Sequence, residues 1–534
     1  MSRDCPAADF ARDGHRAVSP LPRISIRQLV TRCTVDKTPS PRSAPPADGS
    51  LTRAALYGGL WALLNNFGTK VLGGLKTFIL AKLLAPLDFG LMGLALATAS
   101  TINLFSNPGA YTALIQKKEL EAEDMNAAWW LHAARGLALS VLFLPLASLL
   151  ARFFNEPRLV MVLRLVALGF LFDGLQSIGL VRLNRSLDFR RLAIVHQVSN
   201  LVGFAVAVTL AWYLRSVWAL VFAHLGQGAA MLITSYLIAP FRPFPRVSWE
   251  RLKFFLRFGR VVFFAVAAYF LLVRGNEFIL GKVVGVARYG YYALGVSLVG
   301  MLSGPIEQLL TTVAFPALSQ IHQDSERLES AYLRLLRTAM LVSVPLLIGL
   351  AIFGEGLVAL FLGEKWMPIV GPLRWLCLAE WLQLLTLTWQ ALHYSMGMPQ
   401  LQAKFRSIQF LFYAAGVFPM IFEFGISGAA AWLFVVGLFS FFLHLFGTGS
   451  QLPGVPRGAL KMFARYWPLY ALQGLLGVAA HKFARSLPQF MALLVFYGVA
   501  AALFIGWKEK NLFMELLQTV MKRPAAPAEN AGKN

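Results

Sequence analysis

The sequence has little charge, and few of its charged residues are acidic. Charged residues make up 14% of the 534 positions and hydrophobic residues 57%, whereas soluble globular domains carry about 25% charged residues. Lys and Arg outnumber Asp and Glu by 49 to 26, which gives a net charge of +23. This composition excludes a large soluble catalytic domain. In a polytopic membrane protein, basic charge of this kind marks the cytoplasmic side rather than a nucleic-acid surface.

Cysteines and catalytic signatures are also scarce. The three cysteines, Cys5, Cys33 and Cys377, are too few and too scattered for a disulfide framework or a metal site. No G-x-x-x-x-G-K-[ST] sequence occurs, so the chain is not expected to hydrolyse ATP. The sequence also lacks D-x-D and D-D-x-x-D sequences. We therefore expect a protein that is not an enzyme and that holds neither a metal nor another resident cofactor.

Long apolar runs in the sequence indicate the fold class. Runs of about 17 to 25 apolar residues have the length of a membrane-spanning helix, and the sequence contains about fourteen of them. The predicted spans are 55–83, 89–112, 127–150, 160–181, 192–214, 217–239, 258–284, 289–315, 336–355, 371–395, 405–424, 427–447, 466–481 and 488–507. We predict an all-α integral membrane protein.

The spans divide into two sets of six and an additional pair. Residues 1–53 lack an apolar signal-peptide core and are expected to be a disordered cytoplasmic tail. Five segments follow from this parse, and each is expected to be a structural unit or a tail. They are the tail 1–53, an N-lobe 54–250, a C-lobe 251–450, the extra helices of 451–507 and a cytoplasmic C-terminal tail 508–534.

Basic residues concentrate in alternate connections, which predicts the orientation. The connections after the fourth and sixth spans are the most basic, and both would lie on the side that holds the two termini. They carry Arg182, Arg185, Arg190, Arg191, Arg242, Arg246, Arg251, Lys253 and Arg257. By the positive-inside rule, both termini are expected in the cytoplasm and the protein in the inner membrane, with these side chains against anionic lipid.

Part of the chain repeats at an offset of 200 residues. The segment 78–82, FILAK, returns at 278–282 as FILGK, and Gly90 and Leu94 coincide with Gly290 and Leu294. Both copies end one span and run into the next. Because six spans separate them, they share one orientation, and a parallel repeat of this kind is related by an axis along the membrane normal. This arrangement is typical of two-lobed transporters, which hold a substrate cavity between the lobes near the bilayer midplane.

Polar residues follow one face of the first span. At 100° per residue, an arc of about 120° contains all of them: Asn66, Thr69, Lys70, Gly73, Lys76 and Thr77. A central lysine is costly against lipid, so this polar stripe is expected to line the cavity, with Lys70, Lys76, Asn66 and Thr69 binding substrate. The alternative is a seam between helices, with glycines that permit a close approach.

The seventh span carries a second polar patch. Arg274, Asn276 and Glu277 interrupt its apolar run, and the offset of 200 places them at the depth of the first stripe. We expect Arg274 and Asn276 to bind substrate and Glu277 to serve in gating or ion coupling, as a second carboxylate, Asp173, could. Alternatively, Arg274 and Glu277 neutralise each other at i, i+3.

Five short segments carry a family resemblance. They are 83–90 (LLAPLDFG), 113–116 (ALIQ), 153–157 (FFNEP), 315–319 (FPALS) and 363–366 (GEKW). In order and spacing, over about residues 52–450, they resemble the Wzx-type oligosaccharide flippases, the polysaccharide transport branch of the superfamily that also contains multidrug-and-toxin extruders and lipid II flippases.

The resemblance implies a two-lobed bundle that moves undecaprenyl-diphosphate-linked oligosaccharides from the cytoplasmic to the periplasmic leaflet. The expected partners are this lipid-linked substrate, membrane lipids and polysaccharide polymerase or export machinery, with no nucleic acid. Ammonium and guanidinium groups suit a diphosphate. A coupled H⁺ or Na⁺ is one open energy source. Three alternatives remain at this stage: a multidrug or cation extruder of the same superfamily, a membrane glycan polymerase or glycosyltransferase, and a scaffold that does not transport.

Overall fold

The computed structural model describes residues 65, 68–106, 109–117, 120–186, 188–245, 275–449, 451–483 and 487–508. All of them belong to one compact unit, Ala54–Asn534. The described residues form helices joined by short connections, and no strand occurs among them. The all-α prediction is therefore confirmed for this part of the chain. The predicted tail 1–53 lies outside the described residues, as do 509–534, Asn66 and Arg274.

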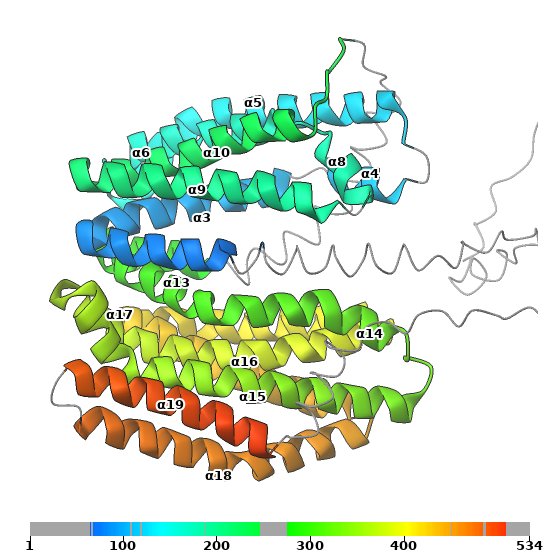
Figure 1. Ribbon diagram of the computed structural model, residues 1–534, viewed down its shortest axis with the longest axis vertical. Helices are drawn as coiled ribbons and strands as arrows, with labels where there is room; N and C mark the ends of the chain where they lie inside the picture. Colours follow the sequence, from blue (N-terminus) through cyan, green and yellow to red (C-terminus); the bar gives the residue numbers. More distant parts are fainter. Residues whose placement is uncertain are drawn as a thin grey trace, which may run out of the picture. The chain divides into compact units, whose positions relative to one another are not determined.

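The first described helix covers 68–83 and is the dark blue helix of Figure 1. The helices that follow in the first half are α3 (Pro86–Ser106), α4 (Ala110–Gln116), α5 (Ala122–Phe154), α6 (Leu159–Val166), α7 (Leu168–Gly174), α8 (Leu180–Arg185), α9 (Phe189–Leu214) and α10 (Trp218–Ile238). Those of the second half are α12 (Gly275–Val283), α13 (Val286–Leu309), η1 (Leu310–Ala314), α14 (Phe315–Ser319), α15 (Ser325–Leu357), η2 (Val358–Leu362), η3 (Glu364–Ile369), α16 (Val370–Ser395), α17 (Pro399–Thr448), α18 (Gly454–Phe483) and α19 (Leu487–Lys508).

Six of the described helices are long and apolar enough to cross a bilayer. They are α3, α5, α9, α10, α15 with its extension to Leu362, and α17. Their outer faces carry large apolar side chains such as Leu149, Trp212 and Leu237, which suits contact with lipid rather than with water. The structure is that of a multi-pass membrane protein, while the count of fourteen spans stays a prediction.

Helix α17 joins two of the predicted spans, 405–424 and 427–447. The two parts run into each other at Gly425, whose φ of 59° and ψ of −137° are not helical. This backbone conformation is open to glycine because glycine has no Cβ. The sequence therefore places the boundary between these two spans correctly, and α17 consists of two helices that meet at Gly425.

The two copies of the repeat contact each other reciprocally. A Cβ on Gly90 would lie 2.0 Å from the carbonyl oxygen of Val286, and a Cβ on Gly290 would lie 1.9 Å from that of Pro86. Both contacts join α3 to α13, and both residue pairs are offset by 200. A two-fold axis between two equivalent segments produces this reciprocity, because each copy then presents the same groups to the other.

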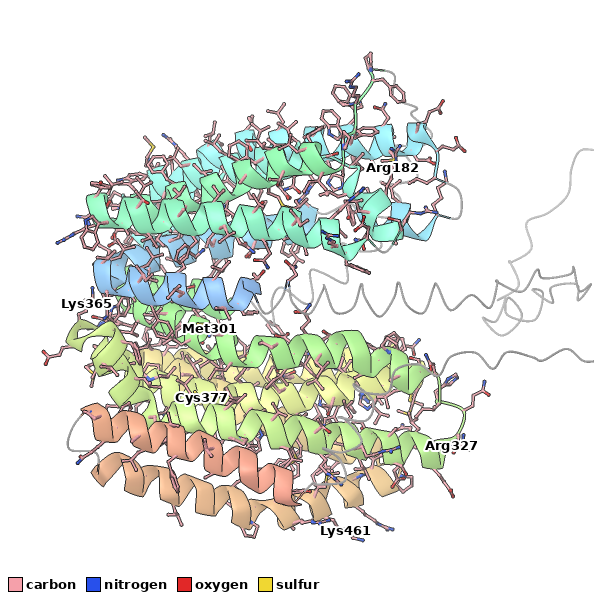
Figure 2. The ribbon with its side chains drawn as sticks, in the orientation of Figure 1. Arg182, Met301, Arg327, Lys365, Cys377 and Lys461 are labelled. Carbon is pink, nitrogen blue, oxygen red and sulfur yellow. The ribbon has the colours of Figure 1, made fainter. Side chains whose placement is uncertain are left out.

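A second set of contacts closes the same end of the bundle. The Lys365 ammonium donates to the carbonyl oxygens of Lys82 (2.8 Å) and Leu84 (2.9 Å), and the Trp366 indole donates to Ala81 O (2.7 Å). The last carbonyls of a helix have no partners within it, so these two side chains of η3 cap the helix 68–83. Figure 2 shows Lys365 beside the end of that helix. We call Lys365, Trp366 and the three capped carbonyls the latch.

Helix α12 contributes a similar contact at this end. The Lys282 ammonium donates to Phe153 O, the end of α5, at 2.5 Å, and lies 5.1 Å from the centre of the Phe153 ring. Trp366 itself is fully buried, edge-on to Phe89 at 5.2 Å. At this end, the first and second halves of the chain are thus joined by charged donors, by an indole and by close backbone contact.

The glycine contact is testable by adding one methyl group. Gly90→Ala is expected to destabilise the protein by about 1 to 3 kcal/mol, because the added Cβ meets a backbone carbonyl that cannot rotate away. The matched control is Gly300→Ala on α13, where a Cβ would meet nothing within 4 Å. Thermal unfolding of the detergent-solubilised protein measures both. Equal midpoints for the two variants would show that the contact is looser than described.

Candidate functional site

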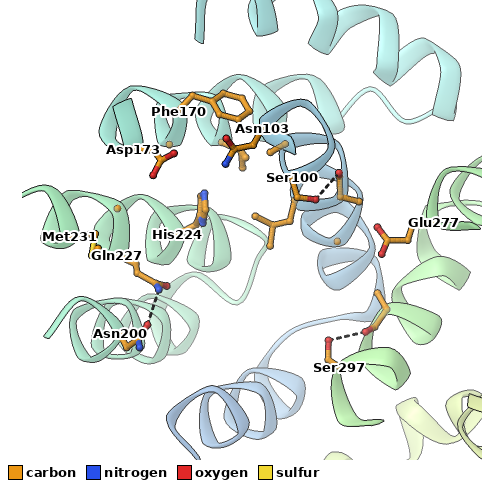
Figure 3. Close-up of a pocket in the computed structure, with 18 of the residues that line it drawn as sticks. Ser100, Asn103, Phe170, Asp173, Asn200, His224, Gln227, Met231, Glu277 and Ser297 are labelled. Carbon is orange, nitrogen blue, oxygen red and sulfur yellow. Dashed lines mark hydrogen bonds between the residues drawn. The ribbon is translucent and has the colours of Figure 1, made fainter. Parts of the chain in front are cut away.

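A cavity of about 640 Å³ lies among the helices of the first half and is closed on one side by α12 and α13. Its walls come from α3, α6, α7, α9, α10, α12 and α13. Figure 3 shows its labelled side chains converging from these helices. The polar side chains that line it include Asn103, Asp173, Gln176, His196, Asn200, His224, Gln227 and Glu277. Such a set inside a membrane bundle indicates a chamber that holds water or a polar ligand, because isolated polar groups in hydrocarbon are costly.

One wall of the chamber is a hydrogen-bond chain across three helices. Gln227 on α10 donates to Asn200 Oδ1 on α9 (2.8 Å), and Asn200 donates to Thr69 Oγ1 on the helix 68–83 (3.0 Å). Gln197 on α9 donates to the same hydroxyl oxygen (3.1 Å) and to the Asn65 carboxamide oxygen (2.8 Å). Thr69 therefore occupies a seam between helices and fixes the wall rather than projecting into the chamber.

The opposite wall carries Asp173. Gln176 donates to Asp173 Oδ1 at 3.2 Å, and Arg135 on α5 lies within electrostatic range of the same carboxylate. The Arg135 guanidinium donates to Asn103, by its side-chain and backbone oxygens, and to Ser106 Oγ (3.1 Å). The Asp173 carboxylate thus lines the chamber, with the Arg135 guanidinium within electrostatic range of it.

The second half of the chain contributes Glu277 to the chamber, from the first turn of α12. Its neighbour Asn276 points elsewhere. The Asn276 carboxamide donates to the Tyr292 hydroxyl (2.7 Å) and accepts from the Tyr413 hydroxyl (3.0 Å), and the side chain is buried. Asn276 therefore ties α12 to α13 and α17, and only Glu277 of this pair reaches the chamber.

The two lysines of the stripe lie outside the chamber lining. Lys70 faces α13, where its Nζ atom lies 2.5 Å from the position of a Cβ on Gly304. Lys76 is partly buried and lies within electrostatic range of His224, which lines the chamber. Thr77 donates to its own helix at Gly73 O (2.9 Å). The stripe is thus divided among a seam with α9, a contact with α13 and the back of the chamber wall.

The six carboxamide and imidazole residues of the chamber were not singled out from the sequence. Asn103 and Gln176 are two of them, and the other four lie on α9 and α10, namely His196, Asn200, His224 and Gln227. Their signal was present in the sequence. In α9 the chamber-lining positions are 196, 199 and 200, and in α10 they are 224, 227, 228 and 231, which is the i, i+3, i+4 spacing of one helix face. Two further polar stripes, on the fifth and sixth predicted spans, could therefore have been read beside that of the first.

The side chains that line the chamber are suited to binding a polar ligand. Carboxamides, imidazoles and carboxylates present both donors and acceptors, as the hydroxyls of a sugar require. Among the described residues, no group of three or more His, Cys, Asp or Glu side chains is placed to hold a metal ion.

Thiol labelling can measure whether the chamber is accessible to water. In a background that lacks the three native cysteines, Gln227→Cys is expected to react with a membrane-impermeant, water-soluble thiol reagent because it faces the chamber. Phe222→Cys, on the outer face of the same helix where Phe222 is 42% exposed, should stay at least about tenfold slower, since thiolates do not form in hydrocarbon. Equal rates, or protection of both, would contradict a water-filled chamber.

The sequence of this chain is similar to those of known membrane proteins. A family model described as polysaccharide biosynthesis protein matches residues 79–371. The chain is 28% identical over 326 residues to the "uncharacterized membrane protein in cps region" of Klebsiella pneumoniae, covering 60% of this chain and 66% of that protein. It is 24% identical over 332 residues to the lipopolysaccharide biosynthesis protein WzxC of Escherichia coli K12, covering 61% and 67%. The chain thus spans about two thirds of the length of these relatives.

Solved structures show the same fold at low identity. The lipid II flippase MurJ, in an inward closed conformation, aligns with a TM-score of 0.69 at 14% identity, over 85% of this chain and 99% of that one. An inward-facing multidrug resistance transporter of the MATE family aligns with a TM-score of 0.50 at 17% identity, over 75% and 94%. The family model covers more than half of this sequence, and the chain belongs to the polysaccharide biosynthesis protein family.

Proposed function

We propose that this protein moves undecaprenyl-diphosphate-linked oligosaccharides across the bacterial inner membrane for the synthesis of a surface polysaccharide. The observation that carries the proposal is the chamber of about 640 Å³, lined by eight carboxamide, imidazole and carboxylate side chains within a bundle of apolar helices, in a member of a polysaccharide biosynthesis family. The fold relative with the higher TM-score is named a lipid II flippase. A lipid-linked glycan needs a polar passage for its head while its prenyl chain stays in the bilayer, and this bundle offers both surfaces.

The glycan and the diphosphate would be held by different parts of the bundle. The chamber, with its carboxamides and imidazoles, suits sugar hydroxyls. The diphosphate suits Lys70 and Lys76, with Asn66, Thr69, Arg274 and Asn276 as the further residues of the proposed site. Thr69 and Asn276 are bonded to neighbouring helices in this structure, so they would join the site only in a state in which those contacts are open. Because Lys70 lies against α13, we propose that it becomes available when the helix 68–83 and α13 move apart.

The transport cycle would be alternating access between two six-helix lobes, residues 54–250 and 251–450, with 451–507 as an added helix pair. With both termini in the cytoplasm, the latch and the Gly90–Gly290 contact would close the periplasmic end. Substrate would then enter from the cytoplasmic leaflet, and release would require the latch to open. A rocking motion of this kind needs no covalent step.

The energy source is proposed to be a coupled H⁺ or Na⁺, with Glu277 or Asp173 as carrier. Both carboxylates line the chamber, one from each half of the chain. A carrier in this position would sense the substrate directly. A polysaccharide polymerase or export complex is the proposed recipient of the flipped unit.

Multidrug extrusion is the second candidate function, and the same two carboxylates favour it. A cationic substrate requires a carboxylate in the cavity, and the first span has none between Leu56 and Leu84, whereas Asp173 and Glu277 face the chamber. The substrate class therefore distinguishes the two candidates.

A deletion strain tests the proposal. Loss of the protein is expected to cause accumulation of a prenyl-diphosphate oligosaccharide, detected by lipid extraction and mass analysis. Unchanged lipid pools together with new drug sensitivity would instead identify an extruder.

Complementation of the deletion strain with Lys70→Glu should leave membrane insertion intact and reduce polymer output by more than about tenfold, because a carboxylate repels the diphosphate. The control is Lys461→Glu, on the exposed face of α18. Normal polymer output with Lys70→Glu would refute the proposed role of the lysine.

If the latch holds one end of the bundle closed, weakening it should shift the protein from the closed toward the open conformation. Lys365→Met removes two charged hydrogen bonds to the end of the helix 68–83 and should favour the open form by about 1 kcal/mol, or roughly fivefold. Spin labels at Ala85→Cys and Glu364→Cys, both exposed positions, would report the change as a longer distance. The control is Arg374→Gln, which breaks an ion pair of 2.9 Å with Glu355 inside the second half. Identical distance distributions for both variants would rule out a gating role for Lys365.

A further inference from the structure

A second buried polar cluster lies away from the chamber, where α16 ends and the two ends of α17 meet. It consists of His393 on α16 with Gln402, His444 and Thr448 on α17. The four side chains are 0%, 1%, 0% and 0% exposed. The imidazole rings stack with centres 5.7 Å apart and planes 16° apart. Helix α16 carries the cluster about 40 Å from the latch, given its 26 residues and a rise of about 1.5 Å per residue.

One carboxamide joins the two rings. Gln402 Oε1 lies 3.0 Å from His393 Nδ1 and 3.3 Å from His444 Nε2. The other nitrogen of His444, Nδ1, lies 2.8 Å from the carbonyl oxygen of Ser440. Both oxygens can only accept hydrogen bonds. In this arrangement, His444 must carry a proton on each nitrogen to satisfy both contacts, which makes it an imidazolium.

With the Gln402 carboxamide turned over, both rings can be neutral and keep all their hydrogen bonds. The Gln402 amide nitrogen, which has no partner as placed, would then donate to both rings. His444 would keep its proton on Nδ1 for Ser440 O. His393 would carry its proton on Nε2 and donate it to Thr448 Oγ1 (2.8 Å), while the Thr448 hydroxyl donates to His444 O (2.7 Å). Carboxamide orientation follows the hydrogen-bond network, so the orientation of Gln402 is set by the protonation of His444.

The surroundings oppose a charge at this place. Among the described residues, Arg406 is the charged side chain that acts on His444, and it lies one turn from Gln402 on α17. Arg406 donates to Gln390 Oε1 at 3.1 Å. Phe405 packs edge-on to both rings, at 5.0 and 5.7 Å. Apolar side chains of α15, α16, α17 and α18 pack around the cluster, with Leu392, Leu445 and Leu452 among them. The buried hydroxyls of Thr388 and Ser440 also lie in this region and carry no charge.

From this geometry we infer that His393, Gln402 and His444 form a proton-binding site, separate from the two carboxylates of the chamber. The site takes up one proton, on His444 Nε2, and the Gln402 carboxamide turns over to accept from it. His393 releases its Nε2 proton and takes up another on Nδ1, where it also faces Gln402 Oε1, so that the net uptake is one proton. The Thr448 hydroxyl then turns from His444 O to donate to His393 Nε2.

Uptake would be linked to movement of these helix ends. A buried cation without a counter-charge is costly, and no described carboxylate acts on the pair. Protonation of His444 is therefore expected to destabilise the tightly packed form of the cluster. The cluster joins α16 to both halves of α17, which turn about Gly425. Proton binding would loosen the end of the bundle that lies opposite the latch. For transport, this inference rests on the proposed function, whereas the proton site itself does not.

Nuclear magnetic resonance of ring nitrogens tests the site in the full-length protein. The protein is labelled with ¹⁵N-histidine, placed in nanodiscs of bacterial polar lipid and titrated from about pH 8 down to about pH 3, because burial without a counter-charge disfavours the protonated ring. His393→Gln and His444→Gln assign the signals. We expect opposite tautomers at the upper pH, with the proton on Nε2 of His393 and on Nδ1 of His444. On acidification, His444 should gain a second proton, and the His393 tautomer should change in the same transition. The control is His322→Gln, in the exposed connection after α14, which should leave both signals unchanged.

Two substitutions of Gln402 separate this site from a merely structural cluster. Gln402→Glu supplies a carboxylate that accepts from both rings, and should strengthen proton binding about tenfold or more. Gln402→Met should uncouple the His393 tautomer from the protonation of His444. Two neutral rings across the whole pH range, or a titration unaffected by either substitution, would overturn the inference.

The titration needs no substrate, so its outcome does not depend on the result of the deletion experiment. If the glycolipid accumulates on deletion, a drop in polymer output with Gln402→Glu, whose titration is shifted, links the site to transport. Normal output would limit it to proton binding.

Discussion

The polar groups inside this bundle have no access to bulk solvent unless the protein itself creates a wet space, and this constraint organises the rest of the structure. A donor or acceptor in hydrocarbon must find a partner on another helix or face a cavity. Thr69, Asn276 and Arg135 illustrate the first outcome, since each is bonded to a neighbouring helix. The chamber residues Asp173, His224 and Gln227 illustrate the second.

The same constraint explains how the bundle is joined at one end. The helix 68–83 ends with carbonyls that no residue of its own can satisfy, and the donors come from the other half of the chain, from Lys365 and Trp366. A contact of this kind is strong while dry and is exchanged for water when the end opens. In the proposed transport cycle, these backbone carbonyls would provide a closure that is specific in position and still reversible. The glycine pair at 90 and 290 allows the approach that brings these donors within reach.

At the opposite end, the second half of the chain contains a buried cluster whose hydrogen bonds depend on one proton. The chamber, the latch and the histidine cluster thus occupy different places in one bundle, and each is built from polar groups that a purely structural core would not need. In the proposed transport cycle, the chamber would be the place for the substrate, the latch the closure at one end and the histidine cluster the proton site at the other.

The sequence by itself determined the helical class, the approximate bounds of most described helices, the glycine between the two halves of α17 and the 200-residue offset, because apolar run length and backbone freedom are local properties. It also identified Asp173 and Glu277, which do line the chamber. Which way a polar side chain on a helix points depends on the neighbour that packs there, and the tertiary structure alone decided this. It turned Thr69 toward α9, Lys70 toward α13 and Asn276 toward two tyrosines. It also brought His393 and His444, 51 positions apart in the sequence, onto a single carboxamide, because hydrogen-bond partners within a membrane bundle are chosen by helix packing and not by sequence separation.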